Sequence, residues 1–556
     1  MQKLVECVPN FSEGKDRGVL DAIAAEISGV EGASLLDVDP GAATNRTVFT
    51  FVGTPEAAAE AAFRAIRKAA EIIDMSKHHG AHPRMGATDV CPFVPVAGVT
   101  MEDCVAIART VGERAGRELG IPIYLYEKAA STPERESLAN IRAGEYEGLE
   151  EKLKDPHWAP DFGSAKFHPR AGATVIGARE FLIAYNVNLN TRDRKLANEI
   201  AFAIRETGRL KKDAKGNAVT DAAGNKLREP GLLPAVRAVG WYIEEYGCAQ
   251  ISINLLNYNV TPPHVAFEAC VEQARKLGLR VTGSELVGLI PRAAILGAGS
   301  YYLERQGKSS GVPEKELVHT AVRSLGLAEL SPFDPEQKVI EYRIRDKRGS
   351  LVELTARAFA DELSSDSPAP GGGSVAALCG ALGGALGSMV ANLTVGKKGL
   401  ESSWEPMKTA ARRGQELKDW YLSAVDEDTR AFNRVMDAFR LPGKSPEEAA
   451  AKGKAVQEAT KGATLVPLSV LERSLEVCDL AEEAARLGNP NSVSDAGVAA
   501  LCARACAEGA WLNVGINLKS LTDADWVAQT RGKAADLRAR VAARVEAILK
   551  EVEGKI

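Results

Sequence analysis

The stretch ASLLDVDPGAATNRTVFTFVGTPEAAAEAAFRAIRKAAEIID, residues 33–74, decides the fold of the first half of the chain. Within it, 33–38 and 46–53 are short runs rich in aliphatic, β-branched and aromatic residues, so both predict strands. Thr54 and Pro55 then provide an N-cap and a first helical residue, and the alanine-rich segment that follows predicts a helix to about Asp74. Strand-like and helix-like segments also alternate on both sides of the stretch.

The alternation of strands and helices continues to about residue 330. In the first series the further expected strands are 3–8, 88–96 and 121–126, and the further expected helices are 15–29 and 100–119. In a second series the expected strands are FLIAYNVNLN (181–190), 248–256 and 279–289, and the expected helices begin near 192 and 264. Such short units predict an α/β (α+β) fold of two ferredoxin-like sheet-and-helix subdomains.

Two regions depart from this alternation, one inside the second series and one after it. Residues 211–231 are polar and rich in Gly, Asn and Asp, which predicts an exposed hairpin insertion. After residue 350 nearly all of the sequence has helical periodicity and much alanine, which predicts an all-α helical bundle. The predicted domains are therefore 1–180 and 181–330 for the two subdomains, 331–350 for a linker and 351–556 for the helical domain.

The composition is typical of a soluble globular protein, with 45% apolar and 26% charged residues among 556. A net charge of −5 gives no general attraction to nucleic acid or to an anionic membrane surface, so neither is an expected partner. The nine cysteines are scattered and form no CxxC pair, which favours reduced thiols over disulfides or a structural zinc site. The N-terminus has no signal or transit pattern, so a cytoplasmic location is expected.

One segment has to be compared with a membrane span: GGGSVAALCGALGGALGSMVANLTV, residues 371–395. It is long enough to cross a bilayer, but Gly and Ala dominate it and Asn392 lies inside it. Small residues in a long apolar helix also suit close helix packing in a soluble bundle, and no second span accompanies this one. We therefore expect a helix of the bundle rather than a membrane anchor.

The first candidate for chemistry is HHGAHPRMG (78–86), which holds three of the seven histidines of the chain. Gly80 and Pro83 interrupt any helix, so His78 and His82 are not a reliable i, i+4 metal pair. Because His82 precedes a proline, its backbone is biased towards an extended conformation at a loop edge. A histidine whose pKa is near neutrality suits proton transfer between two amines. A surface loop with incidental histidines and a metal site are the alternatives.

The second candidate is WAPDFGSAKFHPRAGATVIGA (158–178), whose glycines and prolines mark a loop. Lys166, His168 and Arg170 give this loop positive charge, and Phe167 gives it an aromatic face. A flat ring with an acidic tail would suit such a loop, because aromatic faces stack on rings and cations bind carboxylates. An ordinary basic surface loop has the same composition, so the residues alone leave both readings open.

The third candidate is DSPAPGGGSVAAL (366–378). Consecutive glycines at the start of a helix leave backbone N–H groups free, so Gly371, Gly372, Gly373 and Ser374 form a candidate anion site. The spacing matches neither a P-loop nor GxGxxG. A tight turn with close helix packing is the alternative.

The fourth candidate is WYLSAVDEDTRAFNRVMDAFR (420–440), in which apolar residues follow one face of a helix: Tyr421, Val425, Phe432, Val435 and Phe439. Asp428 falls within that stripe, and an acid on a buried face must be paired, protonated or functional. A structural ion pair is the alternative to a functional role. Asp426 lies off the stripe and can pair with Arg430 at i, i+4.

Together these segments resemble formiminotransferase-cyclodeaminase across essentially the whole chain. The segments that resemble its formiminotransferase part are LVECVPNFSEG (4–14), LLDVD (35–39), NRTVFTFVG (45–53), HPRMGATDVCPFVPV (82–96), AGEYEGL (143–149) and WAPDFG (158–163). The segments that resemble its cyclodeaminase part are PGGGSVAAL (370–378), ALGSMV (385–390) and VDEDTRAF (425–432). Matches this long, in this order and in both halves are highly specific.

The resemblance implies roles for particular residues. His82 would be the catalytic histidine of formimino transfer, and Asp428, the second aspartate of VDED, the cyclodeaminase residue. One loop would contact folate: Gly163, Ser164, Ala165, Lys166, Phe167, His168, Pro169, Arg170, Ala171 and Gly172. The 371–374 segment is then a candidate for a second folate or anion site. Ring-like homo-oligomers built from dimers are implied as well.

The implied activities are those of a glutamate formimidoyltransferase and a formimidoyltetrahydrofolate cyclodeaminase, in histidine degradation and one-carbon metabolism. The formimino group of N-formimino-L-glutamate would pass to tetrahydrofolate, expected in polyglutamylated form. The 5-formiminotetrahydrofolate would then cyclise to 5,10-methenyltetrahydrofolate and release ammonia. No metal or redox cofactor is expected, because neither step changes an oxidation state or requires a Lewis acid. Lys397, Lys398, Arg412 and Arg413 could hold a polyglutamate tail, although a solvated helix face is the simpler explanation.

Two alternatives remain open from the sequence. One is a related one-carbon enzyme, with a formyl donor in the first part or methenyltetrahydrofolate cyclohydrolase activity in the second. The other is a folate-binding scaffold without turnover.

Overall fold

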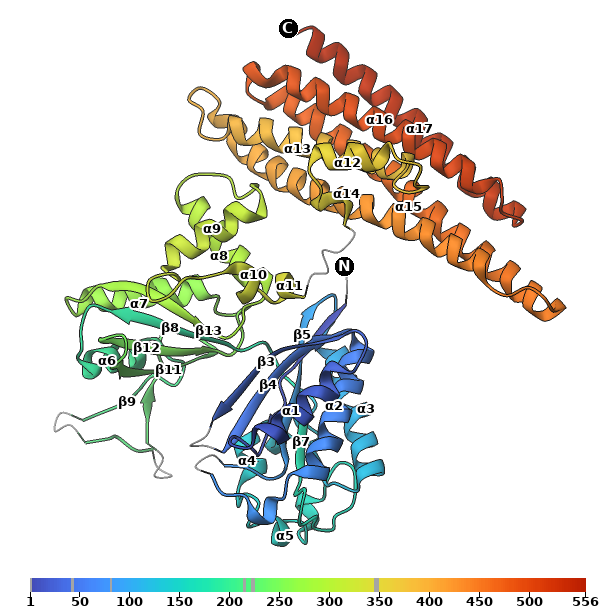
Figure 1. Ribbon diagram of the computed structural model, residues 1–556. Helices are drawn as coiled ribbons and strands as arrows, with labels where there is room; N and C mark the ends of the chain where they lie inside the picture. The colour runs from blue at the N-terminus through green and yellow to red at the C-terminus, as the bar shows by residue number, and fades with distance from the viewer. Residues whose placement is uncertain (1–2, 42–44, 81–82, 214–216, 222–225, 345–349) are drawn as a thin grey trace. The chain divides into compact units, whose positions relative to one another are not determined.

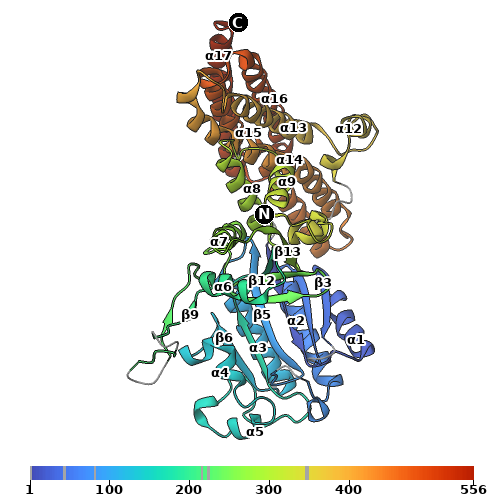
Figure 2. The same cartoon turned by 90° about the vertical axis from the view of Figure 1, so that its left-hand side faces the viewer.

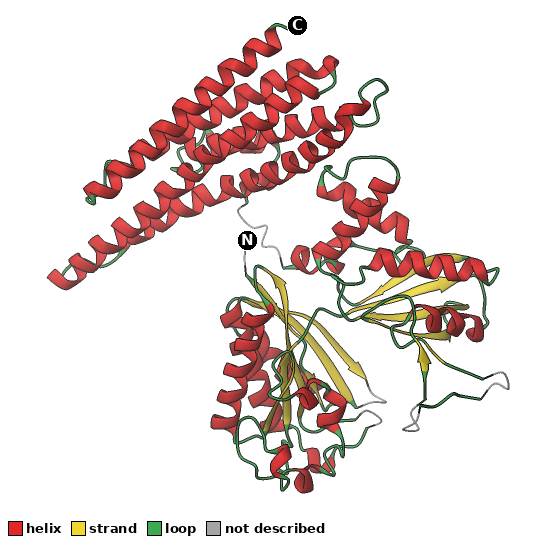
Figure 3. Ribbon diagram, turned by 180° about the vertical axis from the view of Figure 1, so that it is seen from behind, coloured by secondary structure: helices red, strands yellow, loops and turns green. Residues whose placement is uncertain are grey.

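The computed structural model of the chain describes residues 3–41, 45–80, 83–213, 217–221, 226–344 and 350–556. It forms two compact units, Met1–Ala294 with Leu327–Ile344 and Ile295–Gly326 with Arg345–Ile556. The strands lie in the first unit, and the long helices lie in the second (Figures 1 and 3). Each unit is described by itself.

The first sheet has seven strands in the described residues, which are β1 (Leu4–Cys7), β2 (Asn10–Phe11), β3 (Ala33–Gly41), β4 (Arg46–Gly53), β5 (Thr88–Ala97), β6 (Ile123–Glu127) and β7 (Thr174–Ala178). β4 lies between β3 and β1, and β1 also pairs with β5, all antiparallel. One face is covered by α1 (Arg17–Ser28), α2 (Pro55–Ile72) and α3 (Met101–Leu119) (Figure 1). The order β3-β4-β1-β5 with two crossing helices is the predicted ferredoxin-like arrangement.

Local sequence explains where these helices begin. Thr54 caps α2 by accepting a hydrogen bond from the backbone N–H of Ala57, and Pro55 is the first helical residue. Thr100 and Asp103 form a reciprocal capping box at the start of α3. The predicted strands and helices of this series are thus confirmed, with shifts of a few residues at their ends.

Beyond β5 the first sheet has an extension that the sequence analysis did not predict. β7 runs parallel to both β5 and β6 and lies between them. Short elements follow β6 along the chain: η2 (Pro133–Glu136), α4 (Leu138–Arg142), α5 (Leu149–Lys152) and η3 (Pro156–Trp158). Leu149 and Ile141 from these elements pack with Met85, Val90 and Tyr124 in a small second core. This core brings the segment after Pro83 close to the loop before β7.

The second sheet repeats the same design. Its strands are β8 (Ile183–Leu189), β11 (Val236–Ile243), β12 (Cys248–Leu255) and β13 (Val281–Val287), in the order β11-β12-β8-β13 and all antiparallel. α6 (Arg194–Ile204) and α7 (Pro263–Lys276) pack against it. β9 (Arg209–Leu210) and β10 (Arg228–Glu229) pair antiparallel at the base of the predicted hairpin insertion (Figures 1 and 2), of which residues 214–216 and 222–225 lie outside the described residues.

Short helices connect the sheets to the helical part. They are α8 (Arg292–Arg305), α9 (Glu314–Leu325), α10 (Pro335–Lys338), α11 (Ile340–Arg343), η4 (Leu351–Glu353) and α12 (Ala356–Leu363). Residues 335–343, inside the segment predicted as a linker, therefore form two short helices, and backbone hydrogen bonds join them to Ile290. In the division into two compact units, Ile295–Gly326 belongs with the long helices rather than with the sheets.

The helical unit is a bundle of five long helices that lie side by side (Figure 3). They are α13 (Gly372–Thr394), α14 (Trp404–Arg440), α15 (Pro446–Leu487), α16 (Val493–Leu518) and α17 (Ala524–Glu553), with η5 (Glu401–Ser403) and η6 (Pro490–Ser492) at two of the turns. The predicted helical bundle is confirmed.

α13 shows why its sequence is rich in small residues. It packs against α14, α15 and α16, and a Cβ on Gly380 would overlap the ring of Tyr421. In the part of the chain that the structure describes, α13 is the one helix whose length and composition would allow a membrane span. However, 61% of its most apolar window is buried inside the structure. Close packing in the bundle therefore accounts for most of its apolar surface.

Candidate active sites

The segment HHGAHPRMG begins after the short helix η1 (Met75–Lys77) and ends just before β5. His82, predicted to be catalytic, lies outside the described residues, as does Ala81. The structure describes its neighbours on both sides. They form a polar cluster whose centre is Arg84.

Arg84 ties this segment to the acidic motif AGEYEGL. Arg84 is only 6% exposed, and its guanidinium makes two hydrogen bonds to the carboxylate of Glu147, at 2.8 and 2.6 Å. A third hydrogen bond, at 3.0 Å, reaches Glu145. The hydrogen bonds to Glu147 are the main reason why the pKa of Arg84 is raised. The guanidinium is thus held as a permanent cation between two acids.

His78 completes the cluster as a neutral imidazole. Nε2 lies 2.7 Å from the carbonyl oxygen of Asn45, and Nδ1 accepts a hydrogen bond from Nε of Arg84 at 3.3 Å. These partners assign the proton to Nε2, because an arginine can only donate. Burial lowers the pKa of His78, and the charge of Arg84 adds to that effect. His78 therefore acts as a structural support in this cluster.

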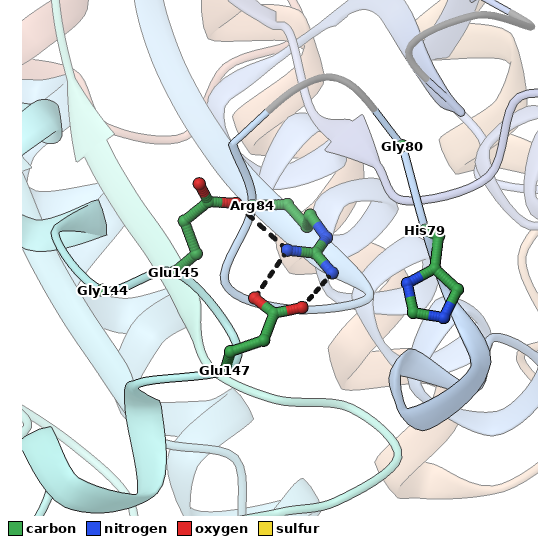
Figure 4. Close-up of a pocket in the computed structure, with 6 residues that line it drawn as sticks. All are labelled: His79, Gly80, Arg84, Gly144, Glu145 and Glu147. Carbon is green, nitrogen blue, oxygen red and sulfur yellow. Dashed lines mark hydrogen bonds and ion pairs between the residues drawn. The ribbon is translucent and has the colours of Figure 1, made fainter.

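A pocket of about 400 Å³ opens beside Arg84. Its lining residues are His79, Gly80, Arg84, Gly144, Glu145 and Glu147 (Figure 4). Figure 4 shows the ring of His79 apart from the Arg84–Glu147 pair, with no drawn interaction between them. A cation, two carboxylates and an imidazole suit a small polar ligand that carries both positive and negative groups.

In the sequence, AGEYEGL indicates only the family resemblance, and neither its two acids, Glu145 and Glu147, nor Arg84 was predicted to have a role. An arginine beside a glycine- and proline-rich loop indicates that acidic partners lie nearby. The sequence does not show which acids these are.

The predicted folate loop, Gly163–Gly172, lies directly next to this cluster. An isolated bridge joins Gly86 to Gly172, and the hydroxyl of Tyr146 in AGEYEGL donates to the carbonyl of Pro169. The ring of Phe167 lies 5.4 Å from the ring of Tyr146. The structure therefore brings together the two predicted segments, HHGAHPRMG and the folate loop, with AGEYEGL between them in the sequence.

Within the loop, the predicted binding residues differ in what they do. Positive φ angles of Gly163 and Gly172 allow close approaches to the backbone that a Cβ would block, at Ile121 and Met85 respectively. His168 is turned inward, because its Nδ1 accepts from the backbone N–H of Ala171 at 3.0 Å.

Several charged and small residues of the loop are exposed, although Ala171 and Gly172 are buried. Arg170 donates to the carbonyl of Glu71 at 3.0 Å. Ser164, Ala165 and Lys166 are exposed. Lys166 is the residue of this loop best placed to reach an acidic group in solvent.

In the helical unit, Asp428 on α14 lies at the N-terminus of α13. Its Oδ2 accepts a hydrogen bond from Oγ of Ser374 at 3.1 Å. Burial raises the pKa of Asp428, and hydrogen bonding from Ser374 opposes that rise. In the described residues Asp428 makes no ion pair, so the structural ion pair considered as an alternative is not found there.

The candidate anion site at 371–374 therefore has a carboxylate of the same chain in front of it. Gly371 is the N-cap of α13 and has no side chain to cap the helix, and the carboxylate of Asp428 lies against this first turn, where it accepts from the Ser374 hydroxyl. A Cβ on Gly373 would overlap this carboxylate. Asn513 of α16 lies next to Gly372.

One expectation on α14 is wrong. Asp426 does not pair with Arg430 but accepts hydrogen bonds from Oγ of Ser350 and the backbone N–H of Leu351, both at 2.7 Å. Arg430 pairs instead with Glu427. The reason is that the segment with Ser350 and Leu351 packs against α14 and donates two hydrogen bonds to Asp426, whereas an ion pair with the exposed Arg430 would contribute little.

Three of the four basic residues considered for a polyglutamate tail have partners. Lys397 donates to Asn489, Arg412 lies 3.8 Å from Glu304, and Arg413 pairs with Asp479 at 2.9 Å. Lys398 is exposed. These contacts agree with the simpler explanation of a solvated helix surface.

A second pocket, of about 310 Å³, lies at one end of the second sheet and was not expected. It is lined by Leu189, Asn190, Thr191, Arg192, Tyr246, Gly247, Cys248, Thr282, Glu329 and Leu330. Beside it, the fully buried Gln250 donates to Asn188 at 2.8 Å and to Glu285 at 3.2 Å. The polar pattern of FLIAYNVNLN was a signal for this network, because Asn186 and Asn188 share one face of β8.

No group of three or more His, Cys, Asp or Glu side chains suited to a metal ion is present among the residues that the structure describes. His82 is not among them.

Comparison with known proteins assigns the whole chain. Three family models match in succession. Residues 4–179 match the N-terminal subdomain of the formiminotransferase domain, and residues 184–345 match the formiminotransferase domain. Residues 355–536 match the model described as formiminotransferase-cyclodeaminase. The formimidoyltransferase-cyclodeaminase of Mus musculus is 44% identical over 558 residues, with 100% of both chains covered.

Shorter relatives match parts of the chain. The glutamate formimidoyltransferase of Streptococcus pyogenes serotype M1 is 45% identical over 304 residues, which cover 55% of this chain and 94% of the relative. The methenyltetrahydrofolate cyclohydrolase of Methylorubrum extorquens is 41% identical over 202 residues, which cover 36% of this chain and 97% of the relative. With its three matching models and a relative similar from end to end, the chain belongs to the formiminotransferase-cyclodeaminase family.

Proposed function

We propose that the chain catalyses two consecutive reactions of folate metabolism. It transfers the formimino group of N-formimino-L-glutamate to tetrahydrofolate, and it then cyclises 5-formiminotetrahydrofolate to 5,10-methenyltetrahydrofolate with release of ammonia. The observation that carries this proposal is similarity over the full length to formimidoyltransferase-cyclodeaminase, together with a glutamate formimidoyltransferase that matches more than half of the chain. The two different architectures suit two separate activities.

In the transferase step, we assign His82 as the general base that accepts the proton from N5 of tetrahydrofolate. N5 attacks the amidine carbon of the donor, and His82 returns a proton to the glutamate nitrogen as the adduct collapses. Proton transfer of this kind contributes roughly 10²–10⁴ in rate. The cluster around Arg84 supports the assignment, because it anchors the backbone next to His82 and lines a polar pocket of suitable size.

Folate is proposed to contact the Gly163–Gly172 loop. Phe167 offers an aromatic surface beside Tyr146, and the exposed Lys166 offers a cation to the glutamate end. A polyglutamylated substrate would extend the acidic end further. Bridging of Gly86 to Gly172 keeps this loop next to the segment that carries His82.

In the cyclodeaminase step, N10 attacks the formimino carbon and ammonia leaves. We assign Asp428 to move protons between these nitrogens. Among the residues that the structure describes, its half-buried carboxylate is hydrogen-bonded by Ser374 and has no cationic partner, and burial favours its protonated form. Such a group can both accept and return a proton.

A second function of the helical part has support from the methenyltetrahydrofolate cyclohydrolase relative, which is 41% identical over 202 residues. A cyclohydrolase would open the methenyl ring with water, whereas a cyclodeaminase closes it with loss of ammonia. Measurement of ammonia from 5-formiminotetrahydrofolate and of ring opening from 5,10-methenyltetrahydrofolate separates the two.

We also propose that the protein is a cytoplasmic homo-oligomer that works in histidine degradation without a metal. Self-association is supported by apolar side chains that remain exposed on the bundle: Leu382, Met389 and Leu393 of α13 and Val498, Leu501, Leu512 and Ile516 of α16. Light scattering of the purified protein measures the oligomer, and substitution of Leu382 and Leu393 by Gln should reduce its mass.

One assay tests the two-step proposal. Purified protein is mixed with tetrahydrofolate and N-formimino-L-glutamate, and the methenyl-folate absorbance band and ammonia are followed together. Growth of both supports the two steps. Loss of the donor without the band keeps the transferase and refutes the cyclodeaminase. Folate binding with neither change would leave a scaffold without turnover.

A further inference from the structure

Ser374 has a hydroxyl group with more acceptors than it can satisfy at once. Its Oγ lies 3.1 Å from Oδ2 of Asp428 and 3.1 Å from the backbone carbonyl oxygen of Val425, and the side chain is fully buried. A hydroxyl donates one proton and accepts through its lone pairs. It can therefore donate to either oxygen, and it can accept from Asp428 while it donates to Val425.

We propose that Ser374 is a positioning residue of the cyclodeaminase site that serves both protonation states of Asp428. When Asp428 is ionised, the Ser374 hydroxyl donates to its carboxylate. When Asp428 holds a proton, the hydroxyl turns to the carbonyl of Val425 and accepts a hydrogen bond from the carboxylic acid. This inference rests on the proposed function, in which Asp428 gains and loses a proton in each cycle.

The backbone geometry makes this exchange local. Ser374 is in the first turn of α13, and Val425 precedes Asp428 by three residues on α14, so all three groups belong to one helix–helix contact. Only a hydroxyl proton has to move, and no helix has to shift. The absence of a Cβ on Gly373 allows the carboxylate to approach this closely.

In the described residues, the charged side chains nearest to Asp428 have other partners and do not replace the Ser374 hydroxyl as its donor. On α14, Glu427 is held by Arg430 and Arg434 on the exposed surface, and Asp426 binds the chain before α12. On α16, the side chain next to the start of α13 is the neutral Asn513. Burial raises the pKa of Asp428 and only the hydrogen bonds from Ser374 lower it.

The test uses the full chain and supplies 5-formiminotetrahydrofolate directly. The values of kcat and KM for ammonia release are measured across the acidic and neutral range for the wild-type protein and for Ser374→Ala, Ser374→Thr and Ser388→Ala. Ser388 is the matched control, because it is fully buried on the same helix about four turns away. In the described part of the chain its hydroxyl lies within hydrogen-bond distance of the carbonyl oxygens of Ala411, at 3.1 Å, and Gly311, at 3.3 Å, and has no carboxylate partner.

We expect Ser374→Ala to raise the apparent pKa of the acid limb by about one pH unit and to lower kcat about tenfold with little change in KM. The reason is that the carboxylate loses a donor that both stabilises and orients it. Ser374→Thr should restore the acid limb, and Ser388→Ala should leave it in place. An acid limb that does not move in Ser374→Ala overturns the proposal.

A second readout needs no turnover. If the wild-type protein releases no ammonia, the proposed function fails, and pH-difference infrared spectra still follow the carboxyl band of Asp428, identified by its loss in Asp428→Asn. A band that titrates at a higher pH in Ser374→Ala supports the role of Ser374, and an unshifted band refutes it. If the alanine variant does not fold, Ser374→Cys replaces it, because a thiol has similar size but donates weakly.

Discussion

Arg84 and Glu147 form a bidentate ion pair, in which Nη1 donates to Oε2 at 2.8 Å and Nη2 donates to Oε1 at 2.6 Å. Because the guanidinium is nearly buried, this pair joins the backbone on one side of the pocket to the backbone on the other. Two parallel hydrogen bonds to one carboxylate need a planar guanidinium group, which among the side chains only arginine has.

The first prediction is that Arg84→Lys lowers transferase activity at least about tenfold, because a lysine makes one of the two bonds to Glu147 and cannot also reach His78. Cyclisation of supplied 5-formiminotetrahydrofolate should be unchanged. Steady-state kinetics of both steps check this. Arg114→Lys on the surface of α3, where Arg114 pairs with Glu60, is the control and should change neither step. Equal transferase activity in both variants would contradict the role given to Arg84.

The second prediction separates the two sites. His82→Ala should abolish formimino transfer and leave cyclisation of supplied 5-formiminotetrahydrofolate intact, whereas Asp428→Asn should do the reverse. The physical reason is that the two residues belong to different compact units with separate cores. Each step is assayed alone with its own substrate. A folded variant that loses both activities would refute the assignment of separate sites.

The parts of the fold that follow from local sequence were predictable. Thr54 and Thr100 start α2 and α3 as expected, because an N-cap depends only on residues within one turn. β7 was missed, because its place between β5 and β6 depends on parallel pairing with strands distant along the chain. A short apolar run next to a loop does not indicate such a partner.

The same division applies to the site. Helical periodicity placed Asp428 on a buried face, but its hydrogen-bond partner Ser374 is 54 positions away and could not be found from spacing. The expected pair of Asp426 with Arg430 failed for the same reason, since the true partners Ser350 and Leu351 come from a distant segment. Sequence predicted which side chains carry chemistry, and tertiary packing determined what they contact.

The third prediction concerns Glu6 of β1, which is 4% exposed. Burial raises the pKa of its carboxyl to about 7, although the charge of Arg179 opposes the rise. Between its ordinary pKa of about 4.3 and the raised value, the folded state binds the proton more tightly than the unfolded state does. The stability that Glu6 contributes is therefore complete below that window and is lost as the pH rises to about 7.

Glu6→Gln should remove this dependence, because the amide stays neutral. We expect the variant to exceed the wild-type protein in stability above neutral pH by up to about 3 kcal/mol, and the difference should fade below about pH 5. Scanning calorimetry at several pH values measures it. Glu31→Gln, at an exposed position, is the control. A difference that does not vary with pH would show that Glu6 is not the titrating group.

The fourth prediction is that Gly373→Ala impairs the cyclodeaminase at least about tenfold and spares the transferase. The new Cβ would overlap the carboxylate of Asp428, which must then move away from the N-terminus of α13 and from Ser374. Alanine is otherwise favoured over glycine in a helix, so a loss cannot come from helix propensity. Gly453→Ala on α15, where a Cβ meets no atom within 4 Å, is the control and should keep both activities. Full cyclodeaminase activity in Gly373→Ala would mean that the contact between Asp428 and α13 is not needed for the reaction.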